Sequence, residues 1–174
     1  LGLSLSALAA TALATPSPAP NPGDVIKAAL NVSKFTLQTI SLPDWKGGDL
    51  QIACELPSGP AVLALTPHSI RSDSFKLLVD DGRHLTLTDA PAPRTFKGEV
   101  FELVGGSTFV GRIRASLLDD GLYARIVMDD GSLYGIQPLS SVLPNSTRGD
   151  HVLYDMVDAV PGDWKCGVDA IGSP

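Results

Sequence analysis

The chain has 174 residues, a formal net charge of -6 and a hydrophobic fraction of 44%. This length suits one domain with terminal extensions and is enough to bury a core. The 13 Lys and Arg residues form no cluster that could follow a phosphate backbone, so the composition argues against a nucleic-acid partner.

Residues 1–14 are predicted to be a secretory signal peptide that lacks its basic n-region. The stretch is rich in Leu and Ala, and it ends in Ala12-Leu13-Ala14 before a run of Pro and Ser. A buried helix is the alternative, but the stretch is short and the prolines that follow would end it. We therefore expect a secreted or cell-surface protein, with no membrane-spanning segment in the rest of the chain.

Residues 15–30 are predicted to form a Pro-rich leader with a short helix, in which Asp24 lies near the helix start. Asn31 and Asn145 each begin an Asn-x-Ser/Thr triplet. These triplets would accept glycans in a eukaryotic host, although such triplets are also common by chance.

Residues 31–158 are predicted to form an all-β domain. Short runs of β-branched, Leu and aromatic residues alternate with polar residues and are separated by Gly, Pro and Asp, which is typical of strands. The runs are 50–56, 61–66, 74–79, 84–88, 95–103, 108–117, 122–128 and 132–138. We expect an antiparallel meander that forms a β-sandwich or a partly open barrel, with a helical or disordered N-terminal leader and an irregular C-terminal tail.

The triplet Asp-Asp-Gly occurs at 80–82, 119–121 and 129–131, between predicted strands. Asp-Gly favours a two-residue type I′ hairpin turn, because both central positions of that turn need positive φ. Calcium loops are the alternative, but none of the three has the alternating oxygen ligands of an EF-hand. We expect hairpin turns.

Catalytic signatures are mostly absent from the sequence. It contains no G-x-S-x-G elbow and no phosphate-binding glycine loop. His68, His84 and His151 lack the spacing of a zinc helix, and we expect them to be surface residues or hydrogen-bonded core residues. Most carboxylates lie in predicted turns. This segment is therefore not expected to be an enzyme or to bind a cofactor by itself.

The two cysteines have different surroundings. Cys54 lies within an apolar alternation and is predicted to face the core. Cys166 lies in a polar tail, where Lys165 would lower the pKa of its thiol and Gly167 would let the backbone approach another surface. One thiolate cannot form a zinc site, but it can complete one as the fourth ligand.

The segment Lys165-Cys166-Gly167-Val168-Asp169 resembles the cysteine switch of secreted zinc metalloproteases. Residues 95–139 are similar to the course of the reprolysin (adamalysin-type) prodomain, and 151–158, HVLYDMVD, resemble its segment just before the switch. The chain differs from that family in having no proline shortly before Cys166, and it has Ala115-Ser116-Leu117 where the family often has a cysteine.

The resemblance implies an inhibitory, folding-assisting prodomain, with residues 159–174 as a switch tail that leads to a catalytic domain beyond this sequence. Cys166 would ligate the zinc of that domain, its intramolecular partner, and Lys165, Gly167, Val168 and Asp169 would support the switch. The alternative is an extracellular β-sandwich binding or adhesion module with a Cys54–Cys166 disulfide, which suits an exported chain with two cysteines.

Overall fold

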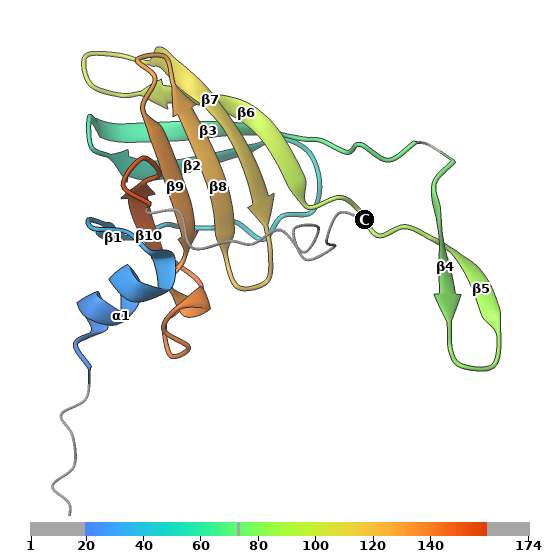
Figure 1. The fold of residues 1–174 in the computed structure, drawn as a ribbon. Coiled ribbons are helices and arrows are strands. Elements are labelled where there is room, and N and C mark those ends of the chain that lie inside the picture. The colour runs from blue at the N-terminus through green and yellow to red at the C-terminus, as the bar shows by residue number, and fades with distance from the viewer. Residues whose placement is uncertain (1–19, 73, 160–174) are drawn as a thin grey trace, which may run out of the picture.

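The computed structural model describes residues 20–72 and 74–159, and Figure 1 shows their arrangement. Its elements are α1 (Pro22–Leu30), β1 (Thr36–Thr39), β2 (Leu50–Leu56), β3 (Gly59–Pro67), β4 (Lys76–Asp80), β5 (Leu85–Asp89), β6 (Thr95–Glu102), β7 (Thr108–Leu117), β8 (Leu122–Met128), β9 (Leu133–Pro138), the 3-10 helix η1 (Leu139–Ser141) and β10 (Asp150–Asp155). The signal peptide, most of the leader before α1 and the tail that carries Lys165 to Asp169 lie outside the described residues.

Eight strands form one antiparallel sheet in the order β1-β10-β9-β8-β7-β6-β3-β2, which curves into a nearly closed barrel. The all-β prediction is confirmed. The two end strands of this sheet are joined by a side chain: the Gln38 amide donates to the Glu55 carbonyl oxygen (3.2 Å) and accepts from the Glu55 N–H (2.9 Å). Gln38 of β1 thus takes the place of a ladder contact with β2 and bridges the gap in the barrel.

The core lies inside the barrel because the strands alternate as the sequence pattern predicts. In β2, every second residue from Leu50 to Leu56 is buried, and the residues between them are exposed. The buried cluster draws on β2, β3 and β6 to β10, and Ile40 adds to it from the end of β1. Each inward-facing side chain of these strands therefore has apolar neighbours from several strands.

Helix α1 begins at a capped N-terminus: the side chain of Asn21 accepts from the N–H of Gly23 (2.9 Å), and Pro22 occupies the first turn. The helix ends at Asn31, which has a positive φ of 53°. Ile26, Val32 and Val152 are buried but do not belong to the barrel core. The helix lies beside β10 (Figure 1).

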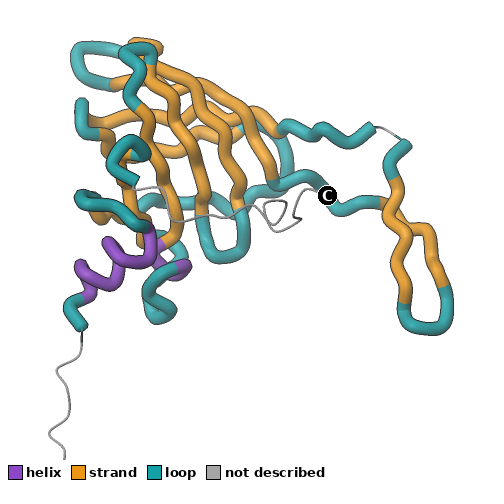
Figure 2. The backbone as a smooth tube through the Cα atoms, viewed as in Figure 1, coloured by secondary structure: helices purple, strands orange, loops and turns teal. Residues whose placement is uncertain are grey.

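Strands β4 and β5 form a separate two-stranded sheet that stands away from the barrel (Figures 1 and 2). Its two legs leave the barrel together, because the His68 N–H donates to the Thr95 carbonyl oxygen (2.8 Å). Both strands were predicted as strands, but their separation from the main sheet was not. We call this two-stranded sheet the arm.

The three Asp-Asp-Gly segments do lie between hairpin strands, as predicted, but the predicted turn type is wrong. Only the glycine of each has positive φ, at 83°, 147° and 88° for Gly82, Gly121 and Gly131. A type I′ turn needs positive φ at both central residues. The loops are longer than two residues, since Asp80 pairs with Leu85 and Leu117 pairs with Leu122.

Side-chain hydrogen bonds explain why aspartate suits two of these turns. The Asp81 carboxylate accepts from the N–H groups of Arg83 and His84 (2.8 and 2.7 Å), and that of Asp130 accepts from Ser132 (2.8 Å). These bonds lower the pKa of both carboxyl groups. Each carboxylate thus accepts hydrogen bonds from backbone N–H groups of its own turn, which is the common role of Asp in such loops.

Candidate functional site

Cys54 is a free thiol in β2, 7% exposed, with its side chain in the barrel core. Burial, and then the negative charge of Glu55, raise its thiol pKa to about 12. A thiol with this pKa is almost wholly protonated near neutral pH and is a poor nucleophile and metal ligand. The prediction that Cys54 faces the core is confirmed, and its role is packing.

The tail that carries the predicted switch begins at an anchored turn. The N–H of Met156 donates to the carbonyl oxygen of Leu133 (2.8 Å), and that of Ala159 donates to Met156 (3.3 Å). The Ser33 hydroxyl donates to the Asp158 carboxylate (3.0 Å). The predicted switch residues follow this turn and lie outside the described residues; they are Lys165, Cys166, Gly167, Val168 and Asp169. The structure therefore describes where the tail begins but not the switch itself.

The histidines do not converge. His84 is exposed in the turn of the arm, His68 is half-buried at its base, and His151 is fully buried in β10. Among residues 20–72 and 74–159, no group of three His, Cys, Asp or Glu side chains is placed to hold a metal ion. In this part of the chain, no helix is both long and apolar enough to span a bilayer.

His151 is hydrogen-bonded on both ring nitrogens. Nε2 accepts from the Leu122 N–H (3.0 Å), and Nδ1 lies 2.7 Å from the Gly149 carbonyl oxygen, to which it donates. Gly121 is required beside it, because a Cβ there would lie 2.9 Å from Nε2 and 2.7 Å from Pro138. His151 therefore connects β10 to the β7–β8 turn, and the prediction of a hydrogen-bonded core histidine is confirmed for it.

The two predicted glycan acceptors are both exposed. Asn31 lies at the end of α1, and Asn145 lies in the turn that follows η1. Each is reachable by a modifying enzyme, and glycosylation remains a prediction.

An open groove of about 890 Å³ lies where the arm joins the barrel, and its lining is mainly apolar. Trp45, Pro91 and Leu118 contribute to the lining, and so does Ile70, which is 96% exposed. The leucine face of the arm, formed by Leu78, Leu85 and Leu87, is also exposed, each side chain by more than 60%. The arm and its groove thus present apolar surface that is unusual for an isolated protein.

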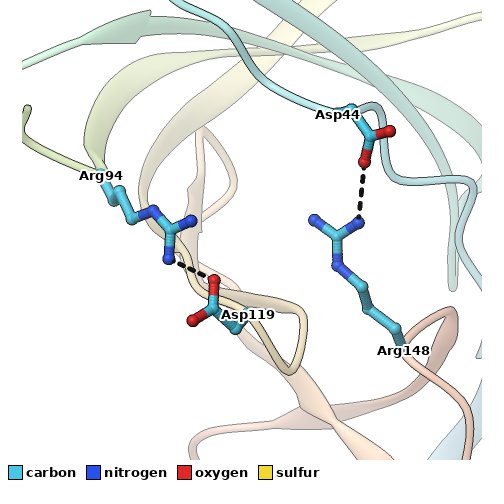
Figure 3. Close-up of polar contacts among 4 residues, drawn as sticks. All are labelled: Asp44, Arg94, Asp119 and Arg148. Carbon is cyan, nitrogen blue, oxygen red and sulfur yellow. Dashed lines mark hydrogen bonds and ion pairs between the residues drawn. The ribbon is translucent and has the colours of Figure 1, made fainter.

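Two ion pairs frame a smaller hollow of about 290 Å³ beside this groove (Figure 3). Arg94 contacts Asp119 (2.6 Å), and Arg148 contacts Asp44 (3.5 Å). The carboxylates are 90% exposed, so each pair adds at most about 1 kcal/mol of stability. Each pair joins two loops at this end of the barrel: Arg94 before β6 contacts Asp119 after β7, and Arg148 before β10 contacts Asp44 after β1.

A second groove, of about 510 Å³, lies on the outer face of the barrel, and we call it the outer groove. Its lining includes Arg114, Tyr123, Arg125, Tyr154 and Met156. Along the register, Lys97, Arg114 and Arg125 stand side by side on three neighbouring strands, and all three are exposed. Among the described residues, none of the three forms an ion pair with a carboxylate.

Gly135 continues this row and makes room for Tyr154. A Cβ at Gly135 would lie 2.4 Å from the tyrosine ring, so the ring rests directly on the backbone of β9. Gln137 donates to the Tyr154 hydroxyl (3.0 Å) and fixes the ring. This row was not predicted from the sequence, although the alternation in 108–117 already places Arg112 and Arg114 on the polar face.

No protein-family model matches the chain, and no curated protein matches it.

Proposed function

We propose that this chain is the inhibitory and folding-assisting prodomain of a secreted zinc metalloendopeptidase, and that Cys166 holds the enzyme latent. The partner is inferred from the resemblance of residues 165–169 to a cysteine switch: it is the catalytic domain of the same metalloprotease. The catalytic zinc would belong to the downstream protease domain, where it activates the attacking water. A Cys166 thiolate in the fourth ligand position excludes that water, so hydrolysis cannot begin.

The main support for the proposal is that the β6–β10 meander leads directly into the C-terminal tail. The segments that resemble the reprolysin prodomain occupy β6, β7, β8, β9 and β10, which are neighbours in one antiparallel meander. This meander ends at the anchored turn of Met156 to Ala159. From Ala159, an extended chain reaches about 25 Å to Cys166. A rigid barrel at one end of such a segment can hold the thiol near a docked partner.

The arm supplies a second contact in this proposal. A two-stranded hairpin is marginally stable alone in water, and this one exposes Leu78, Leu85 and Leu87 on one face. A protein domain packed against that face would bury the leucines. Arm and tail would then hold the protease domain at two points, which strengthens binding beyond either contact alone.

The test is inhibition in trans. Residues 22–174, added to the catalytic domain encoded downstream, are expected to inhibit peptide hydrolysis, and Cys166→Ser is expected to weaken that inhibition without abolishing it. A serine hydroxyl stays protonated near neutral pH and competes poorly with water for zinc. Cys54→Ser is the matched control, because it removes the other thiol and leaves the tail intact.

Two outcomes would contradict the proposal. One is Cys166→Ser inhibiting as strongly as the parent sequence. The other is a downstream reading frame that encodes no H-E-x-x-H helix. Mass spectrometry that finds Cys54 and Cys166 joined in one disulfide would favour the extracellular binding or adhesion module instead, since a bridged Cys166 has no thiolate to offer.

A further inference from the structure

We propose that the outer groove and the row of cations along it bind a sulfated polysaccharide, with sulfate groups on Lys97, Arg114 and Arg125 and a sugar ring against Tyr154. This inference goes beyond the proposed function and requires no protease.

The three cations repel one another, although the chain as a whole is acidic. Lys97 lies opposite Arg114 in the register, and Arg114 lies opposite Arg125. Directly opposed side chains on one face of a sheet have Cβ atoms about 5 Å apart, and like charges at that distance are destabilising. Among the residues that the structure describes, none of the three has a carboxylate in an ion pair. An anion bound across the row would remove this repulsion.

The next row on the same face shows the opposite arrangement, in which the charges are balanced. Arg112 lies opposite Glu99 in the register, and the hollow of about 390 Å³ beside them includes Asp49 and Glu99 in its lining. The lining of the outer groove includes Arg114 and Arg125 and, in the described part of the chain, no Asp or Glu. The outer groove is therefore the side of the row that favours an anion.

The spacing of the row suits a ligand with several negative groups. Neighbouring strands lie about 4.8 Å apart, so the three cations span about 10 Å in a line across β6, β7 and β8. Guanidinium groups offer paired N–H donors to an oxyanion, and surface clusters of Lys and Arg are typical of heparin-binding patches. A polyanionic chain that lies across the strands would place a charged group near each cation.

The position of Tyr154 favours a sugar over an acidic peptide. Its partly exposed ring rests on β9 at Gly135, the next position in the row after Arg125, and Gln137 fixes its hydroxyl. Such a ring offers a flat apolar surface against which the C–H face of a sugar can pack. The groove is mainly apolar, and its volume of about 510 Å³ is within the range of small-ligand sites. A run of acidic residues would satisfy the cations but would leave this surface uncovered.

Binding of a heparin oligosaccharide to the full chain tests the proposal, by isothermal titration calorimetry at several salt concentrations. Arg114→Gln with Arg125→Gln is expected to weaken binding about tenfold or more, because two groups that form charge-assisted hydrogen bonds are lost. The slope of log affinity against log salt concentration should become shallower by roughly one for each cation removed.

Tyr154→Leu tests the sugar contact separately from the charges. It is expected to weaken binding severalfold without changing the salt slope, because it removes the ring and no charge. Tyr154→Phe keeps the ring and should keep the affinity. Equal binding by the Leu and Phe variants would overturn the placement of the sugar on Tyr154.

The matched control for the arginine pair is Lys27→Gln with Arg83→Gln. It also removes two positive charges, from exposed positions in α1 and in the turn of the arm, and neither residue lines the outer groove. Its affinity should be nearly that of the parent chain. Chemically desulfated heparin is the ligand control and should not bind. Denaturant midpoints check folding, and the loss of repelling charges should not lower the midpoint of the groove variant.

The proposal is overturned if the unsubstituted chain does not bind the heparin oligosaccharide, or if the control pair weakens binding as much as the groove pair. Polyglutamate that binds as tightly as heparin would also overturn it, and would assign the row to an acidic protein segment. No readout involves peptide hydrolysis or Cys166. A failed heparin assay therefore leaves the proposed function standing, and a failed Cys166→Ser assay leaves this inference standing.

Discussion

Cys54 and His151 both lie inside the barrel, and burial acts on their pKa values in opposite directions. It raises the pKa of the Cys54 thiol and lowers that of the His151 imidazole, because in each case burial penalises the charged form. Both side chains are therefore neutral in the folded protein at pH 7. Neither is suited to acid–base or metal chemistry, and both serve the packing of the barrel.

Cys54 is expected to resist alkylation until the barrel unfolds. With a pKa raised to about 12, the folded protein holds almost no thiolate at this position, and the side chain is only 7% exposed. Mass spectrometry after iodoacetamide treatment, with and without urea, measures this. We expect Cys166 to be modified first. Modification of Cys54 in the folded chain at a similar rate would mean that β2 opens readily.

His151 is expected to make the protein less stable as the pH falls below about 6.5. Burial holds its folded pKa below the ordinary value of 6.5, against the smaller opposing effects of Gly149, Asp150 and Asp120. The unfolded chain binds the proton first, so the stability is complete above pH 6.5 and is lost below it. Carboxylates such as Asp150 titrate lower, because their pKa is depressed from 3.8.

Urea unfolding between pH 5 and pH 7.5 measures this effect. His151→Gln should flatten the pH dependence, since an amide does not titrate but still offers an acceptor to the Leu122 N–H. His84→Gln, in the exposed turn of the arm, should leave the slope unchanged. An equal slope in the native chain and in His151→Gln would assign the pH dependence to other groups.

At the scale of the elements, the barrel is completed by one side chain and not by a ladder. Gln38→Leu is expected to destabilise the protein by about 1–2 kcal/mol, because it removes two hydrogen bonds between β1 and β2. Gln51→Leu is the control, at an exposed position of β2 whose side chain makes no hydrogen bond to the rest of the described chain. Denaturant midpoints compare the two, and equal losses would show that Gln38 does not close the barrel.

The sequence predicted the strands better than their partners. Residues 50–56, 108–117 and 122–128 coincide with β2, β7 and β8, because buried and more exposed residues alternate throughout β2 and through most of β7 and β8. Strand β1 was missed: it is four residues long and mostly exposed, so it has no such pattern. Strand β10 was not predicted as a strand, because its run of buried residues does not alternate.

The separation of the arm from the main sheet could not be predicted from local sequence patterns. Both of its strands read as ordinary strands, but their burial patterns are almost wholly exposed. Whether a hairpin joins a sheet depends on long-range pairing, which the period of one segment does not encode. The outer groove was missed for the same reason, because Lys97, Arg114 and Arg125 become neighbours only through the register of three strands.

At the scale of the whole molecule, the barrel and the arm are separable. The legs of the arm meet at the hydrogen bond between His68 and Thr95. Replacing 69–93 by a short Gly-rich turn would therefore join β3 to β6 as a simple hairpin. The core cluster contains no residue of β4 or β5, so we expect the barrel to keep its circular dichroism spectrum and most of its stability.

The same replacement is expected to weaken inhibition of the downstream protease about tenfold or more, because only the tail contact would remain. Leu78→Thr with Leu87→Thr tests the leucine face alone, and Val79→Thr on the opposite face of the arm is the control. Inhibition constants measured with Cys166 intact separate the contribution of the arm from that of the switch. If the barrel without the arm inhibits as well as the full chain, the leucine face does not bind the protease. If the barrel without the arm fails to fold, the expectation that the two are separable is wrong, and they form one cooperative unit.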